Sequence, residues 1–315
     1  MISVLRPPSR AWPLGLAIAA LLAVGCVGTY RYLANYWTYR GFAPPRDAAF
    51  VKVHGTTARF YVASPALGGR RQPVDVYLPP GYNSHPHERY PVLYLLHGFP
   101  GRPGAFVATV RLGVVEDVLV ARHQLHPMLL VMPFGSTGSF NDKEWANGVS
   151  PHQGWETFVA RDVVRAVDSR YRTIRSADGR ALAGLSEGGY GALNIGFHHP
   201  SEFRVLESWS GYIHADAIRS VFGDTRRVLR WNTPFFRLPH VRSAMLRDHT
   251  YIWFYSGSND SLLPQNRAFD AALSRAGLPH KFFVVRGGHN WALWRGEAAR
   301  AMLAVGRRLG GGHAA

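Results

Sequence analysis

Short apolar runs alternate with amphipathic stretches along most of the chain. Residues 91–96 and 128–132 are continuously apolar, as expected for central strands that are buried on both faces of a sheet. Residues 106–122 and 155–171 carry apolar side chains at helical spacing. Strands separated by helices predict a mostly parallel sheet with right-handed crossovers. Further strands are expected at residues 50–53, 58–62, 74–78, 181–185, 203–209, 251–255 and 281–285, and a last helix at residues 291–309.

The N-terminal region has a different pattern. Residues 11–30 contain no charged side chain, and they lie between Arg10 and Arg31. A helix of about 20 residues, rising about 1.5 Å per residue, can just cross a hydrocarbon core of about 30 Å. Tyrosines and a tryptophan between residues 30 and 39 suit the headgroup interface. We interpret residues 1–40 as a signal anchor and residues 41–57 as a linker and leading strand.

Two alternatives to an anchor remain open. Residues 22–26 resemble a permissive lipobox, which would place a lipid on Cys26. A cleaved secretory signal is the third possibility. All three interpretations export the rest of the chain. We expect an extracytoplasmic domain that is anchored in the cell membrane, with a lipoprotein or a secreted protein as the alternatives.

The composition describes a folded, strongly basic protein. Hydrophobic residues make up 47% and charged residues 18% of the 315 residues, and the net charge is +16. Nearly all of the positive charge is arginine, and it is scattered rather than clustered. This pattern favours a basic surface near anionic lipid or wall polymer, so we expect no nucleic-acid partner. Cys26 is the single cysteine, which excludes an intramolecular disulfide and a thiolate metal cluster.

One stretch carries the candidate chemistry. Gly184, Ser186 and Gly188 form a G-x-S-x-G sequence between an apolar run and a run of small residues that permits a helix. This order is that of a nucleophile elbow, which lifts a serine hydroxyl above a helix N-terminus. The turn is so tight that a Cβ at either glycine would collide with neighbouring backbone. Ser186 itself is expected to adopt a strained conformation.

A serine nucleophile needs a base and an acid that orients the base. His289 follows the last predicted strand and a pair of glycines, so it can reach over the strand ends toward the elbow. Asp260 follows the strand at residues 251–255 in a turn, and the chain order Ser186, Asp260, His289 is that of α/β hydrolases. Asp270 falls inside the next predicted helix and is expected to face solvent.

The oxyanion needs two hydrogen-bond donors. The backbone N–H of Glu187, which follows the nucleophile, is the first. The loop after residues 91–96 should give the second, and the N–H of Phe99 is our choice because Pro100 has none. We expect His97 to be structural, and we expect neither a metal nor a cofactor.

With these residues in place, the chain resembles the esterase D-like branch of the α/β hydrolases. This branch includes feruloyl esterases, S-formylglutathione hydrolases and the mycobacterial mycolyltransferases. The resemblance rests on the sequences at residues 74–82, 90–98, 184–192 and 287–291, together with Trp294.

The resemblance implies an α/β-hydrolase fold, with helices on both faces of a mostly parallel sheet, over residues 58–315. It also implies a catalytic triad of Ser186, Asp260 and His289, with oxyanion amides at Phe99 and Glu187. The side chain of Glu187 departs from the apolar residue expected there, and its charge could disfavour anionic substrates. Residues 214–247 are rich in aromatic residues and arginine, and they are a possible cap that overhangs the active site.

We therefore expect a serine esterase that hydrolyses carboxylic esters of small molecules or lipids at the cell envelope. One alternative is an acyltransferase that moves the acyl group to a sugar or lipid alcohol, since both reactions use the same catalytic residues. The other is a non-catalytic member that binds ligands in the cleft.

Overall fold

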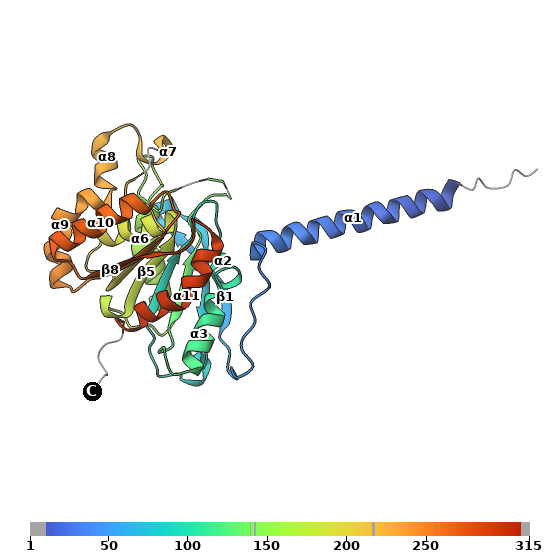
Figure 1. The fold of residues 1–315 in the computed structure, drawn as a ribbon, viewed down its shortest axis with the longest axis horizontal. Coiled ribbons are helices and arrows are strands. Elements are labelled where there is room, and N and C mark those ends of the chain that lie inside the picture. Colours follow the sequence, from blue (N-terminus) through green and yellow to red (C-terminus); the bar gives the residue numbers. More distant parts are fainter. Residues whose placement is uncertain (1–10, 139, 142, 216–217, 310–315) are drawn as a thin grey trace, which may run out of the picture. The chain divides into compact units, whose positions relative to one another are not determined.

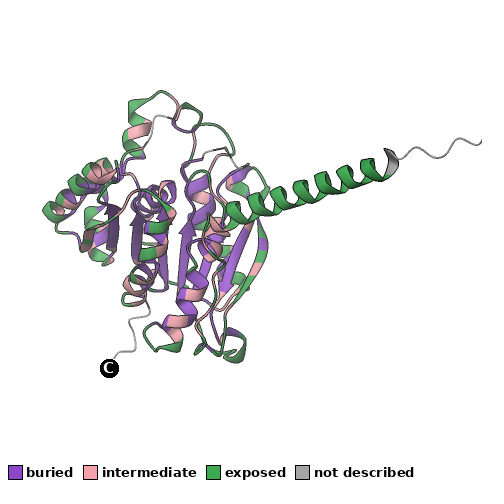
Figure 2. Cartoon of the chain, turned by 45° about the vertical axis from the view of Figure 1, so that its right-hand side comes forward, coloured by how far each residue is buried: buried purple, intermediate pink, exposed green. Residues whose placement is uncertain are grey.

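The computed structural model describes residues 11–138, 140–141, 143–215 and 218–309. The chain divides into two units, one ending at Pro44 and one beginning at Pro45. The first unit contains the helix α1 (Ala11–Tyr39), whose segment Pro13–Tyr39 is long and apolar enough to cross a membrane. Figure 2 shows that α1 is exposed along almost all of its described length. A long apolar helix of this kind is compatible with a signal anchor or a membrane span.

The second unit is built on an eight-stranded sheet in the order β1-β2-β4-β3-β5-β6-β7-β8 (Figure 1). β1 pairs antiparallel with β2, and β2 pairs antiparallel with β4, whereas all pairs from β4 to β8 are parallel. The sheet is therefore mostly parallel, as the sequence predicts. The strands are β1 (Thr56–Ser64), β2 (Arg70–Leu78), β3 (Val92–Leu96), β4 (Leu129–Pro133), β5 (Arg180–Leu185), β6 (Val205–Trp209), β7 (Tyr251–Gly257) and β8 (His280–Val285).

Helices cover both faces of the sheet, which confirms the predicted α/β-hydrolase architecture. In β3, Val92, Tyr94 and Leu96 join the apolar core with α5, α6, α9 and α10, while Leu93 and Leu95 join the opposite core with α2, α3 and α11. The α-helices of this unit are α2 (Ala105–Ala108), α3 (Leu112–Ala121), α4 (Trp155–Thr157), α5 (Val164–Arg170), α6 (Glu187–His198), α7 (Arg219–Phe222), α8 (Arg226–Trp231), α9 (Pro234–Arg247), α10 (Leu263–Ala276) and α11 (Trp291–Gly306). Short helical turns are η1 (Pro65–Leu67), η2 (Tyr82–Ser84) and η4 (Ala177–Gly179), and the π-helix η3 (Phe158–Val163) joins α4 to α5.

The strand predicted at residues 50–53 is wrong, because this segment is a turn and irregular chain. The last residue of β2, Leu78, pairs with Thr56, the first residue of β1. Two prolines follow Leu78, so β2 does not continue alongside the residues before Thr56. No strand remains there to pair with residues 50–53. The helix predicted at residues 106–122 is divided into α2 and α3 by Arg111, whose φ of 62° lies in the left-handed region.

Residues 214–247 contain the successive helices α7, α8 and α9, between β6 and β7. A small apolar cluster of Ala146, Tyr190, Val221 and Phe222 attaches them to the elbow helix α6. The Tyr190 hydroxyl also donates a hydrogen bond to the carbonyl of Asn232, at 2.7 Å. In Figure 1, α7 and α8 project beyond one end of the sheet.

Candidate active site

Ser186 lies at the turn between β5 and α6 and has φ 56° and ψ −122°. A positive φ is rare for a residue with a side chain, so the backbone is strained here as the sequence predicts. The Ser186 N–H donates to the carbonyl of Trp209 at the end of the adjacent β6, at 3.0 Å. This bond fixes the turn to the sheet, and the serine hydroxyl stands at the carboxyl end of the strands.

The two glycines of the elbow have no room for a side chain. A Cβ at Gly184 would lie 2.2 Å from the carbonyl oxygen of Gly188, and a Cβ at Gly188 would lie 1.9 Å from the carbonyl oxygen of Leu96. Both contacts are with backbone atoms, which cannot move aside. The close approach of β5, α6 and β3 therefore requires glycine at both positions.

The structure brings the three predicted side chains together. His289 Nε2 lies 2.8 Å from Ser186 Oγ, and His289 Nδ1 lies 2.9 Å from Asp260 Oδ2. Each ring nitrogen of the histidine therefore has one partner, in the chain of contacts that a serine nucleophile, a base and an orienting acid require. The side chain of Asp260 is fully buried, whereas that of His289 is 33% exposed. His289 thus faces the solvent side and Asp260 lies beneath it.

Asp260 and His289 lie on the loops that follow β7 and β8, and hydrogen bonds join these two loops. The Ser258 N–H donates to the carbonyl of Val285 at 2.7 Å, and the Asn259 N–H donates to the carbonyl of Gly287 at 2.9 Å. These bonds extend the pairing of β7 and β8 beyond the sheet. Gly257 has no space for a side chain, because its Cβ would lie 2.5 Å from the Gly287 oxygen. The packing of the two loops therefore requires glycine at Gly257, whereas a Cβ at Gly288 would have its nearest neighbour 3.7 Å away.

The environment of Asp260 favours its charged form. Burial by itself would raise the pKa of this carboxyl, but hydrogen bonds from His289 and from the Leu262 N–H outweigh burial, so the pKa lies below its ordinary value. The Leu262 N–H donates to Oδ1 at 2.9 Å. The buried Ser210 hydroxyl makes a smaller contribution in the same direction, although its Oγ lies outside ordinary hydrogen-bond geometry. No sequence motif distinguishes Ser210, because only the fold brings it near Asp260.

Trp294 of α11 lies beside His289. Its indole ring meets the imidazole of His289 edge to face, with ring centroids 5.1 Å apart. Its Nε1–H donates to the carbonyl of Trp209 at 3.2 Å, and this is the carbonyl that also accepts the Ser186 N–H. One carbonyl of β6 therefore anchors both the turn at Ser186 and the tryptophan beside His289.

The loop that was predicted to hold the second oxyanion donor lies against the elbow. A Cβ at Gly98 would lie 3.0 Å from Ser186 Cβ and 3.0 Å from the Leu185 oxygen. Phe99 follows at once, and within the part of the chain that the structure describes its N–H donates to no acceptor. Glu187 is the first residue of α6. The Glu187 amide therefore adjoins Ser186 in the chain, and the residue before Phe99 packs against Ser186.

His97 is buried beneath this loop and is neutral. Its Nδ1–H donates to the carbonyl of Gly98 at 3.0 Å, and its Nε2 accepts the Gly135 N–H at 3.1 Å. Burial lowers the pKa of His97 to about 4. Its carbonyl accepts the indole N–H of Trp145, which is fully buried, at 2.9 Å. Both residues therefore shape the loop and do not face the solvent.

The Glu187 side chain has a buried acidic neighbour that the sequence does not predict. The hydroxyl of Tyr212 donates to Glu144, and its ring stacks on Tyr190 with centroids 4.8 Å apart. Burial, and then the charges of Glu144 and Glu187, raise the pKa of Tyr212 well above its ordinary value. The Glu187 side chain, only 4% exposed, therefore lies near a second carboxylate. Residues 144 and 212 are 68 positions apart, so no spacing rule links them.

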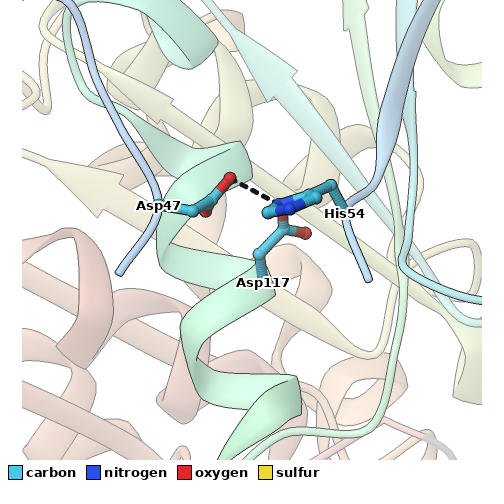
Figure 3. A group of neighbouring side chains, drawn as sticks. All are labelled: Asp47, His54 and Asp117. Atoms are coloured by element: carbon cyan, nitrogen blue, oxygen red, sulfur yellow. Dashed lines mark hydrogen bonds and ion pairs between the residues drawn. The ribbon is translucent and has the colours of Figure 1, made fainter. Parts of the chain in front are cut away.

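A second group of titratable side chains lies outside the cleft (Figure 3). His54 Nδ1 lies 2.8 Å from Asp47 Oδ2 and 3.8 Å from Asp117 Oδ2, so the three could hold a metal ion. However, Asp117 Oδ1 already accepts the hydroxyl of Tyr77 at 2.5 Å, and both of its oxygens accept the Gly55 N–H. Asp117 is therefore already occupied, and its contacts with His54 and Gly55 fasten this segment to α3, whereas Asp47 Oδ1 is buried without a hydrogen-bond partner among the described residues. Asp270 is also occupied elsewhere, since its Oδ1 lies 3.1 Å from His280 Nε2.

Comparison with known proteins gives a consistent result. The model of the Esterase family, described as "Putative esterase", matches residues 64–304. Esterase Rv1288 of Mycobacterium tuberculosis is 30% identical over 245 residues, which cover 69% of this chain and 52% of that protein. The chain therefore spans about half the length of this relative.

Two further matches bear on the fold and the reaction. The solved structure of a ferulic acid esterase superposes with a TM-score of 0.72 at 25% identity, and the match covers 82% of this chain and 100% of that one. The diacylglycerol acyltransferase/mycolyltransferase Ag85B of Mycolicibacterium smegmatis is 25% identical over 218 residues, which cover 55% of this chain and 65% of that protein.

Proposed function

The chain belongs to the Esterase family, and on this premise we propose that it is a serine esterase that hydrolyses carboxylic esters through an acyl-enzyme on Ser186. The observation that carries the proposal is the chain of contacts from Ser186 Oγ through His289 to Asp260, at 2.8 Å and 2.9 Å. A positioned base next to a serine hydroxyl activates it as a nucleophile. The Esterase family match supports the same reaction.

The first step forms the acyl-enzyme. His289 Nε2 takes the proton of Ser186 Oγ while the oxygen attacks the ester carbonyl, and the carbonyl oxygen becomes an oxyanion. Asp260 holds the imidazole with Nδ1 protonated and stabilises the imidazolium. The C–O bond of the ester then breaks, and His289 returns the proton to the departing alcohol.

The second step releases the acid. Water replaces the alcohol and loses its proton to His289 Nε2 as it attacks the acyl carbonyl. The tetrahedral intermediate collapses, Ser186 Oγ regains the proton, and the carboxylic acid leaves. In both steps the oxyanion would receive hydrogen bonds from the Phe99 and Glu187 amides, which would strengthen as the charge develops. The residues at the site supply every proton transfer that the reaction needs.

The test is covalent labelling with a fluorophosphonate probe together with hydrolysis of a panel of esters of different chain length. We expect the wild-type chain to be labelled, and Ser186→Ala to lose the label and at least about 10⁴-fold in kcat. Ser84→Ala, at an exposed position in η2, is the matched control and should keep both. Labelling or hydrolysis that persists in Ser186→Ala would exclude this site. A folded wild-type chain that neither labels nor hydrolyses would favour a non-catalytic binding protein.

An acyltransferase is the second candidate, supported by the similarity to the acyltransferase Ag85B. It would use the same residues, with a sugar or lipid alcohol in place of water in the second step. Product analysis by mass spectrometry, with and without glucose or a diacylglycerol, separates the two reactions. Acyl transfer that exceeds hydrolysis at millimolar acceptor would replace the hydrolase proposal.

We also propose that the catalytic unit works at the outer surface of the cell membrane, on small-molecule or lipid esters. The length and hydropathy of α1 support a membrane anchor, and the net charge of +16 suits an anionic surface. Residues 58–315 would then form the catalytic domain, with residues 214–247 as its cap. Fractionation of cells, followed by protease treatment of intact cells, tests the location and the orientation.

A further inference from the structure

A hollow of about 610 Å³ lies between β7, β8 and α11. Four cationic side chains line it: Lys281, Arg300, Arg307 and Arg308. Three aromatic rings line it as well, those of Tyr251, Trp253 and Phe283. None of the lining residues is acidic.

The hollow is separate from the candidate active site. Tyr251 is the first residue of β7 and Lys281 is the second residue of β8, so both lie at the amino ends of their strands. Ser186 follows the last residue of β5, which runs parallel to them. None of the residues that line the hollow belongs to the candidate active site, and the strands β6 and β7 lie between β5 and β8. The hollow lies at the edge of the sheet, because β8 is the last strand (Figure 1).

The floor of the hollow is apolar. Trp253 is 4% exposed, and its ring meets that of Phe283 edge to face with centroids 5.0 Å apart. Leu303 and Ala304 of α11 complete the floor. A fully hydrated ion would leave this surface in contact with water, so the floor favours a ligand with an apolar part.

The rim of the hollow is positive. The guanidinium of Arg308 lies over the Tyr251 ring at 4.0 Å, and that of Arg300 lies over the Phe283 ring at 4.8 Å. Arg300 also forms an ion pair with Glu297, at 3.1 Å. The side chains of Lys281 and Arg307 form no hydrogen bond or ion pair within the part of the chain that the structure describes. Two uncompensated cations therefore border the aromatic floor.

We propose that this hollow binds the headgroup of one anionic phospholipid. The phosphate would lie between Lys281 and Arg307, and the glyceryl and first acyl carbons would lie on Trp253 and Phe283. The volume fits one small ligand, since ligand sites commonly enclose about 300–1,000 Å³.

Two features of the chain favour a lipid over other anions. The same chain carries a helix that is long and apolar enough to enter a bilayer, which would keep the folded unit near a lipid surface. Juxtamembrane lysine and arginine residues are attracted to anionic headgroups, while aromatic rings suit the boundary between headgroups and acyl chains. Binding here would give the folded unit a second attachment to the membrane, independent of catalysis.

Isothermal titration calorimetry of the full chain in an uncharged detergent tests the proposal. The ligands are dihexanoyl phosphatidylglycerol, dihexanoyl phosphatidylcholine, inorganic phosphate and dodecanoate. We expect the phosphatidylglycerol to bind most tightly, and its affinity to fall roughly 10- to 30-fold in Lys281→Gln/Arg307→Gln.

The control variant is Arg70→Gln/Arg71→Gln, which removes the same charge near the opposite edge of the sheet, where Arg71 lies over the Tyr61 ring. It should bind like the wild type, and both variants should hydrolyse a soluble ester at the wild-type rate. An equal loss of affinity for the phosphatidylglycerol in the two double variants would overturn the proposal. Binding of phosphate or of dodecanoate as tight as that of the phosphatidylglycerol would also overturn it, because the site would then select an inorganic anion or a fatty carboxylate.

Discussion

The imidazole of His289 and the indole of Trp294 meet edge to face, with their ring centroids 5.1 Å apart. The indole is held in turn by its hydrogen bond to the carbonyl of Trp209. The tryptophan therefore restricts the rotation of the base and keeps Nε2 directed at Ser186. Since proton transfer depends steeply on position, a loosened histidine should transfer protons more slowly.

We expect Trp294→Leu to lower kcat about tenfold with little change in KM, and Trp294→Phe to restore part of the loss, because it keeps an aromatic edge beside the imidazole. Trp253→Leu is the matched control, because both indoles are buried in the same apolar cluster. Both leucine variants should lower the melting temperature, but the loss of kcat should be confined to Trp294→Leu. Equal losses of kcat would show that Trp294 acts only through stability.

Asp260→Asn should remove the control of the histidine tautomer. The amide can still accept the Leu262 N–H, but it cannot stabilise an imidazolium, so we expect kcat to fall about 10⁴-fold. The pKa of Asp260 lies below its ordinary value of 3.8, so the acid stays charged at neutral and mildly acidic pH. Asp270→Asn, on the exposed side of α10, should retain full activity. Ester hydrolysis by the two asparagine variants at pH 7 distinguishes the two acids.

Gly188→Ala places a methyl group 1.9 Å from the Leu96 carbonyl oxygen. We expect it to lose about 3 kcal/mol of stability or more, and to lose fluorophosphonate labelling with it. Gly296 makes a matched comparison, because a Cβ there meets nothing within 4 Å. In the middle of α11, Gly296→Ala should stabilise the chain by about 0.5–1 kcal/mol through helix propensity. We expect the melting temperature of Gly188→Ala to lie below that of the wild type, and the melting temperature of Gly296→Ala to lie above it.

Glu207 should make the stability depend on pH. It is buried within β6, and burial raises the pKa of its carboxyl well above the ordinary value of 4.5, although the Trp209 indole N–H partly offsets this. Above pH 4.5 the unfolded chain loses this proton while the folded chain keeps it. The free energy of unfolding therefore falls as the pH rises toward the folded pKa.

Glu207→Gln removes this dependence. Relative to the wild type, it should gain roughly 1 kcal/mol of stability or more between pH 5 and pH 8. The control is Glu88→Gln, at an exposed position, which should follow the wild type at every pH. Urea unfolding in an uncharged detergent measures both, and parallel curves for all three chains would contradict the prediction.

Glu187→Gln should change the choice of substrate. Two carboxylates, Glu144 and Glu187, lie near Tyr212 and would repel an anionic substrate. We expect the variant to raise kcat/KM for a hemisuccinate ester about threefold to tenfold relative to a neutral acetate ester. The backbone amide of residue 187 is unchanged, so hydrolysis of the neutral ester should stay within about twofold. An equal fall in kcat/KM for both esters would instead indicate that the substitution damages the elbow.

The sequence by itself determined the order of elements and the identity of the candidate residues. The elbow glycines, the chain order of Ser186, Asp260 and His289, and the apolar runs of β3 and β4 are local signals, because turn geometry and burial on both faces restrict the residue types directly. They predicted the parallel sheet and the three side chains that the structure brings within hydrogen-bond distance.

Only the tertiary structure decided the rest, because it depends on contacts between segments that no spacing rule connects. β2 ends at Leu78 and leaves residues 50–53 without a partner strand. The carbonyl of Trp209 joins the nucleophile turn to Trp294, 85 residues away. Lys281 and Arg307 look like two of many scattered basic residues until β8 and α11 place them around one aromatic hollow. Neighbouring residues determine the local backbone conformation. The arrangements named above depend instead on packing between helices and strands that are far apart in the sequence.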